Sequence, residues 1–176
     1  MHILDIVRNS VEANAKDIFV SMKIDTDDVL TICFEDNGRG MSPDMAKNVT
    51  DPFVTTRTTR KVGMGLSLLK MNAELTNGTL SVESEQDKGT IVSATFNLSH
   101  IDCLPFGNLG SVFAMLLGGN PSHTFLFEFS VKEDEFKINS DEIWLMLKET
   151  GLSQPKMMML LKEMINNNLK DMNFYL

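Results

Sequence analysis

The chain has 176 residues, a formal net charge of -8 and 43% hydrophobic residues, which fits one domain or one domain with an extension. It has no basic stripe and no apolar run near the roughly 20 residues of a membrane-spanning helix, so composition argues against nucleic acid and membranes as partners. The N-terminus has a charged amphipathic pattern unlike a signal peptide, and Cys33 and Cys103 are too few for a disulfide framework, which favours a cytoplasmic setting.

Apolar periodicity predicts a helix over residues 3–16 and two strands over 18–24 and 29–35, joined by the acidic turn 25–28. Ser42 and Pro43 then predict a short helix to about residue 49. Residues 50–65 have little periodicity and are predicted to be a loop, and a helix follows over 65–75. Strands over 79–85 and 90–97 form a predicted hairpin across the turn 86–89.

The composition changes after residue 100, and residues 101–176 are predicted to be a small α+β extension beside a first domain of residues 1–100. The pattern predicts a helix over 109–117, a strand over 125–131, a partner strand over 136–138 across the turn 132–135, and helices over 141–150 and 153–169. Ser140 is the expected cap of the first of these two helices. The face that carries Phe125, Phe127 and Phe129 must be covered by the chain's own helices or by another chain.

One group of residues could recognise a purine. Asp36 follows a predicted strand and precedes Gly38 and Gly40. A carboxylate can accept a purine amino group, and glycines let the backbone pass close to the ring. On the first helix Asp5, Asn9 and Glu12 share one face, where an Asn can ligate a metal that carries phosphates. Read separately, the two features are a Gly-rich turn and a solvated polar stripe.

A second group could hold phosphates. Gly63 and Gly65 open a predicted helix, where backbone N–H groups can face an anion. The loop before them collects hydroxyls and cations within an acidic protein, which favours a lid over a polyphosphate more than a solvated loop. The lid candidates are Thr55, Thr56, Arg57, Arg60 and Lys61. A further hydroxyl, that of Thr90, could reach the purine end of the site.

This ordered set resembles the ATP-binding domains of gyrases, heat-shock chaperones, histidine kinases and MutL proteins over about residues 2–98, with the histidine-kinase-like ATPases closest in pattern. The resemblance implies a two-layer α/β sandwich of the Bergerat type, with helices on one face of a mixed sheet. It implies ATP and magnesium as ligands, with Asn9 as the magnesium ligand and Asp36 as the acceptor of the adenine amino group. Asp51-Pro52-Phe53 resembles the Phe box, Gly63 and Gly65 the Gly box, and Gly89-Thr90 the last box. The ATP contacts that it implies also include Met41, Met64 and Leu66.

The catalytic position departs from part of this superfamily. Asp5 stands four residues before Asn9, where the gyrase and MutL branches usually place a Glu that activates water. Asp is one methylene shorter and Arg8 could pair with it, so Asp5 is a weak candidate general base. The chain begins close to this helix, so we expect no dimerising helix pair with a phosphoacceptor histidine. Of the other ligand types, His100, Asp102 and Cys103 give a weak zinc signal.

The sequence therefore predicts a magnesium-dependent ATP-binding protein of signal transduction, which hydrolyses ATP or transfers its γ-phosphoryl group to a separate protein partner. One alternative is a non-catalytic ATP sensor or assembly module. Another is a protein-serine kinase of the anti-sigma type, which also lacks the helix pair. The Met-rich last helix is a candidate docking surface, and a homodimer through residues 101–176 is a further possibility.

Overall fold

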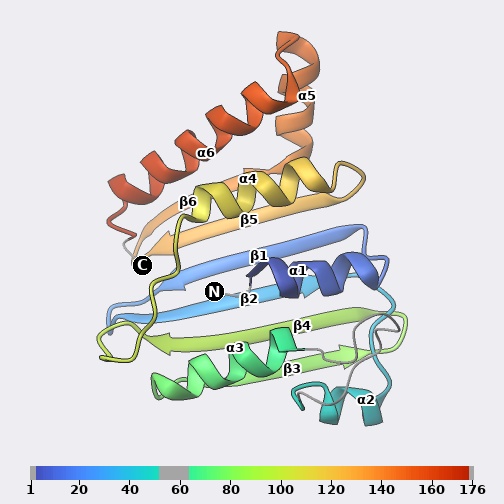
Figure 1. The fold of residues 1–176 in the computed structure, drawn as a ribbon, viewed down its shortest axis with the longest axis vertical. Coiled ribbons are helices and arrows are strands. Elements are labelled where there is room, and N and C mark those ends of the chain that lie inside the picture. The colour runs from blue at the N-terminus through green and yellow to red at the C-terminus, as the bar shows by residue number, and fades with distance from the viewer. Residues whose placement is uncertain (1–2, 52–63, 175–176) are drawn as a thin grey trace.

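The structure, a computed structural model, describes residues 3–51 and 64–174. Its framework is a mixed six-stranded sheet with the strand order β3-β4-β2-β1-β5-β6 (Figure 1). The strands are β1 Asp17–Ile24, β2 Val29–Asp36, β3 Leu80–Glu85, β4 Gly89–Asn97, β5 Thr124–Val131 and β6 Asp134–Asn139. The helices are α1 Ile3–Glu12, α2 Pro43–Asn48, α3 Met64–Leu75, α4 Leu109–Gly119, α5 Ser140–Thr150 and α6 Gln154–Asp171.

Helices α1, α3 and α4 lie on one face of this sheet (Figure 1). Alternate side chains of the central strands point toward them, because successive residues of a strand face opposite sides. Met22 of β1 lies opposite Ile32 of β2, and both are fully buried. On α1 the buried positions include Ile6 and Val7, whose side chains belong to the same core. The predicted two-layer α/β sandwich is confirmed.

Helix α1 ends at Glu12, four residues earlier than the apolar pattern predicts. Asn14 has a left-handed backbone with a φ of 58°, which ends the helical path. The carbonyl of Ala13 accepts a hydrogen bond from the backbone N–H of Arg39 at 2.9 Å instead of continuing the helix. The end of α1 is therefore fixed by a loop that follows β2.

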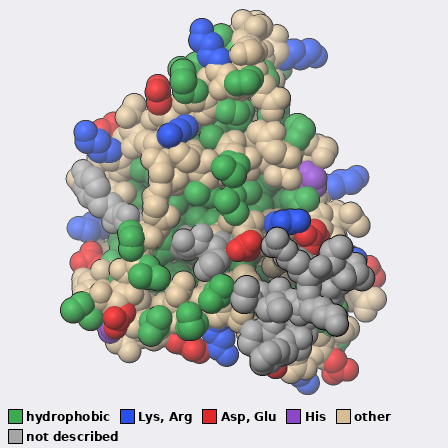
Figure 2. Space-filling view, in the orientation of Figure 1, with side chains coloured by type: hydrophobic (Ala, Val, Ile, Leu, Met, Phe, Trp, Pro, Cys, Tyr) green, Lys and Arg blue, Asp and Glu red, His purple; other side chains and the backbone are tan. Residues whose placement is uncertain are grey.

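Residues after 100 continue the sheet of the first half. Strand β5 pairs in parallel with β1 over the whole length of β1, and β6 pairs with β5 as a hairpin. Phe125, Phe127 and Phe129 are fully buried, and Phe113 of α4 covers them with ring centroids 4.3 Å from Phe127 and 5.1 Å from Phe129. The chain's own helices thus cover the aromatic face. Figure 2 shows further hydrophobic side chains gathered around α4 and between α4 and α1.

Helix α6 packs against α4, and a glycine permits their close approach. A Cβ at Gly110 would lie 2.5 Å from the Lys162 carbonyl oxygen, and the Gly110 N–H donates to Asn166 Oδ1 at 3.1 Å. Among the described helices, none is both long enough and apolar enough to cross a membrane.

Two local predictions in this half are wrong. The turn between β5 and β6 is the two residues Lys132 and Glu133, because Lys132 adopts a positive φ of 54° and lets the strands pair up to the turn. The cap of α5 is Asn139, whose Oδ1 accepts the N–H of Asp141 at 2.9 Å. Ser140 instead accepts the N–H of Phe125 at 2.8 Å and is fully buried.

Candidate nucleotide-binding site

Asp36 is the last residue of β2, a strand that is paired on both sides by β1 and β4. Both oxygens of its carboxylate are held by the protein. Ser10 Oγ donates to Oδ2 at 2.7 Å, and the N–H of Gly38 donates to Oδ1 at 2.9 Å. An ionised carboxylate has about four acceptor sites, so each oxygen can still accept one further hydrogen bond.

The two glycines after Asp36 are required by close packing. A Cβ at Gly38 would lie 2.8 Å from the Ala13 Cβ and 2.9 Å from Asp36 Oδ1. Gly40 has a φ of +60°, and a Cβ there would overlap the carbonyl oxygen of Glu85. The backbone therefore runs tightly between the end of α1 and the β3–β4 turn.

A single hydroxyl joins this loop to the edge of the sheet. Ser84 Oγ accepts the N–H of Met41 at 2.9 Å, donates to the carbonyl of Gly89 at 2.9 Å, and lies 2.9 Å from Thr90 Oγ1. A hydroxyl has one proton and two lone pairs, so Thr90 is the donor in the last contact. Thr90 lies opposite Asp36 in the β2–β4 register, so these residues lie at the same end of the sheet.

Asn37 attaches the loop to β1. Its Oδ1 accepts the backbone N–H groups of Lys16 at 2.8 Å and Asp17 at 3.0 Å, and its Nδ2 donates to Asp17 Oδ2 at 2.6 Å. The loop that carries Gly38 and Gly40 is thus bound to α1, β1 and β3.

On α1, Asp5 and Asn9 lie on the exposed face, as their spacing predicts. Arg8 Nε contacts Glu12 Oε1 at 3.0 Å. The start of α3 lies against the same helix, because a Cβ at Gly65 would be 3.1 Å from the Cβ of Asp5. The candidate general base is therefore next to the predicted Gly box.

Met64 is the first residue of α3, and Leu66 is 8% exposed within the core. The remaining predicted contacts fall outside the described residues and stay predictions. They are Thr55, Thr56, Arg57, Arg60, Lys61 and Gly63, together with Pro52 and Phe53 of the predicted Phe box.

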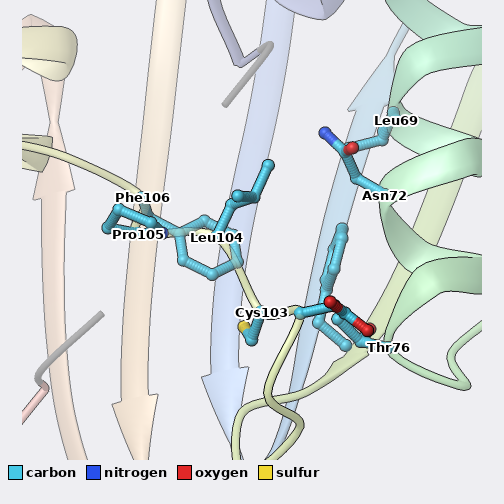
Figure 3. Close-up of a pocket in the computed structure, with 9 residues that line it drawn as sticks. Leu69, Asn72, Thr76, Cys103, Leu104, Pro105 and Phe106 are labelled. Atoms are coloured by element: carbon cyan, nitrogen blue, oxygen red, sulfur yellow. The ribbon is translucent and has the colours of Figure 1, made fainter.

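A separate small pocket of about 30 Å³ lies between α3 and the segment that follows β4 (Figure 3). Leu69 and Asn72 line it from α3, Thr76 lines it from the turn after this helix, and residues 102–106 line it from the other side. None of the predicted ATP-binding residues lines it. Its volume suits a water molecule and is far too small for a nucleotide.

Within residues 3–51 and 64–174, no three His, Cys, Asp or Glu side chains come together as a metal site. This finding does not support the weak zinc signal at His100, Asp102 and Cys103.

Burial raises the pKa of the Cys33 thiol, and the charge of Glu35 raises it further; burial also raises the pKa of Cys103. Both thiols are therefore weak nucleophiles at neutral pH.

Sequence reasoning missed Ser10, Asn37 and Ser84 as parts of the site. A signal for Ser10 was present, since it occupies the buried stripe of α1 beside Ile6 and Val7. A polar side chain at such a position needs a partner. Nothing comparable marks Ser84, whose role depends on strand register.

Residues 2–100 match the family of histidine kinase-, DNA gyrase B- and HSP90-like ATPases, and the chain belongs to this family. It is 35% identical over 94 residues to sporulation kinase E of Bacillus subtilis, and the aligned region covers 52% of this chain and 13% of that protein. It is 31% identical over 85 residues to a protein described as an NtrY-like sensor histidine kinase of Rickettsia typhi, covering 48% of this chain and 14% of that protein. The chain thus spans a small part of the length of these relatives.

The fold is similar to the crystal structure of the N-terminal domain of a DNA repair protein, with a TM-score of 0.52 and 17% identity over 78% of this chain and 50% of that chain. This share is larger than residues 2–100 could supply, so the similarity includes part of the residues after 100. The family match makes residues 2–100 of this chain an ATP-binding region of the histidine-kinase-like class.

Proposed function

We propose that this chain binds ATP with magnesium and either hydrolyses it or transfers its γ-phosphoryl group to a separate protein. The observation that carries the proposal is the carboxylate of Asp36, held by Ser10 and Gly38 in a loop with no room for side chains at Gly38 and Gly40. A carboxylate that is fixed in this way and can still accept hydrogen bonds suits the amino edge of adenine.

The donor set on α1 suits magnesium. The amide oxygen of Asn9 is a hard ligand, and magnesium is usually held by one or two protein oxygens together with substrate phosphates. Asn9 would hold the ion, which neutralises charge on the triphosphate when bound. Gly65 keeps the start of α3 close to Asp5, which would put the helix N-terminus near the phosphates.

A second candidate function is an ATP sensor or assembly module without catalysis. It is favoured by the short side chain of Asp5 at the position of the general base. A protein-serine kinase of the anti-sigma type, a homodimer and a protein partner docked on residues 101–176 stay predictions.

The two cysteines are free thiols, which supports a reducing, cytoplasmic compartment.

Incubation of the purified protein with γ-labelled ATP and magnesium separates these functions. Free labelled phosphate supports an ATPase, and label on a co-purified protein supports a kinase. Tight binding without either product supports a sensor. No binding of ATP at any magnesium concentration would reject all three.

Asp36→Asn tests the site itself. We expect about a hundredfold loss of ATP affinity, because a hydrogen bond to a charged group contributes about 1.5–3 kcal/mol. Isothermal titration calorimetry measures the affinity, and thermal unfolding without nucleotide confirms that the variant is folded. Asp171→Asn, at the exposed end of α6, is the matched control and should bind as the parent does. Normal ATP binding by Asp36→Asn would refute the assignment.

A further inference from the structure

Ser10 is one of three buried polar residues among those described, and its partner distinguishes it from the other two. Thr76, directly after α3, donates to the carbonyl of Ala73 in that helix, and Ser140 accepts a backbone N–H of β5. Ser10, which is 5% exposed, donates to the carboxylate of Asp36 at 2.7 Å. Hydrogen bonds from a hydroxyl to an ionised oxygen are short and about twice as strong as neutral ones.

The contact joins two parts of the chain that are 26 residues apart. Ser10 lies on a helix, whereas the second donor to Asp36, the N–H of Gly38, lies on the loop after β2. One donor per oxygen, from two separate elements, fixes both the position and the plane of the carboxylate. Without the hydroxyl, one oxygen is held and the carboxylate can rotate.

The helix that carries Ser10 is itself anchored to the loop. The carbonyl of Ala13, directly after α1, accepts the N–H of Arg39, and the Cβ of Ala13 lies 2.8 Å from where a Cβ of Gly38 would be. The hydroxyl is therefore held rigidly relative to the carboxylate. Asn9, the proposed magnesium ligand, is the preceding residue of the same helix.

We infer that Ser10 is a positioning residue for base selection: its hydroxyl holds the Asp36 carboxylate in the orientation that accepts the 6-amino group of a purine nucleotide. The inference rests on the proposed function, because it assumes that Asp36 faces the base. It assigns to Ser10 a role in discrimination between purines and no role in binding the phosphates.

The test compares ATP with purine riboside triphosphate, which has a hydrogen in place of the 6-amino group. In Ser10→Ala we expect about a five- to tenfold loss of ATP affinity and less than a twofold change for the analogue. Calorimetric titrations of the full chain in magnesium give both values. Ser10→Thr keeps the hydroxyl and should restore the ratio of the two affinities.

Ser140→Ala is the matched control, since it removes the hydroxyl of the other buried serine, which bonds to Phe125. It should lower stability and leave the ratio unchanged. If Ser10→Ala does not fold, Ser10→Cys fills the same space with a weaker donor, and the same fall in the ratio is expected.

Equal losses for the two nucleotides in Ser10→Ala, or no loss for either, would overturn the inference while the parent still bound ATP through Asp36. A parent protein that does not bind ATP, or an Asp36→Asn variant that binds it normally, would instead overturn the proposed function. The two failures are therefore distinguishable.

Discussion

At the scale of single residues, the candidate site depends on the donors that hold the Asp36 carboxylate and on the absence of a side chain at Gly38. Asp36 supplies the carboxylate, and Ser10 and Gly38 each hold one of its oxygens. Gly38 has a second function, because it has no Cβ and so lets the loop pass close to Ala13. The same small residue thus permits the packing and donates the hydrogen bond.

Gly38→Ala should destabilise the fold by about 1–3 kcal/mol, the usual cost of an extra carbon in a packed site. The new Cβ would meet both Ala13 and the Asp36 carboxylate, so ATP affinity should fall as well. Urea denaturation gives the free energy of unfolding, and calorimetry gives the affinity.

Gly119→Ala is the control for this change, because a Cβ at this end of α4 would have nothing within 4 Å apart from its chain neighbours and the backbone of its own helix. It should leave the free energy of unfolding within about 1 kcal/mol of the parent, as helix propensity is then the main effect. Equal free energies of unfolding for Gly38→Ala and Gly119→Ala would show that the loop after β2 relaxes around the new methyl group at position 38.

At the scale of elements, the start of α5 shows how two adjacent polar residues have different functions. Asn139 caps the helix through Asp141, whereas Ser140 satisfies the N–H of Phe125 on β5. A local pattern favours either residue as the cap, because both types are good N-caps. The position of β5 next to Ser140 decides which residue caps the helix and which one bonds to the strand.

Ser140→Ala should be more destabilising than Asn139→Ala. The first leaves a buried N–H without a partner, at a cost of about 1–3 kcal/mol, whereas the second removes a cap, typically worth about 1 kcal/mol. Chemical denaturation of both variants tests the order. The reverse order would mean that water or another group satisfies the Phe125 N–H.

At the scale of the whole molecule, the chain forms one sheet. Strand β1 lies between β2 and β5, so its hydrogen-bonding groups are satisfied from both halves of the sequence. The buried residues on the two sides of position 100 also form one core. The site lies at one end of this shared sheet, beside the first residues of β1.

A fragment of residues 1–100 should therefore be much less stable than the full chain, since it loses the β1–β5 ladder and the cover of α4. Exposed pairing groups along β1 should also make it prone to aggregate. Circular dichroism during thermal unfolding and size-exclusion chromatography measure these effects.

Cleavage of the full chain next to the exposed residue Ile101 is the matched comparison. The two pieces should stay associated, because the sheet and core contacts remain. A fragment of residues 1–100 that unfolds at the temperature of the full chain and binds ATP equally well would contradict this view.

Much of the first half was predictable because its signals are local. Alternating apolar residues identify β1 and β2, and the exposed spacing of Asp5 and Asn9 on α1 follows from helical geometry. The end of α1 was not predictable in this way, because the N–H of Arg39 from a distant loop binds the Ala13 carbonyl.

The sequence by itself predicted which segments form helices and strands and proposed Asp36 and the glycines of the candidate site, since periodicity and glycine spacing act over a few residues. The tertiary structure alone decided that Ser10 reaches Asp36, that Ser84 joins Met41 to Thr90, and that β5 lies beside β1. These contacts depend on strand register and on the placement of helices across the sheet. They join residues far apart along the chain, and no local pattern encodes such a pairing.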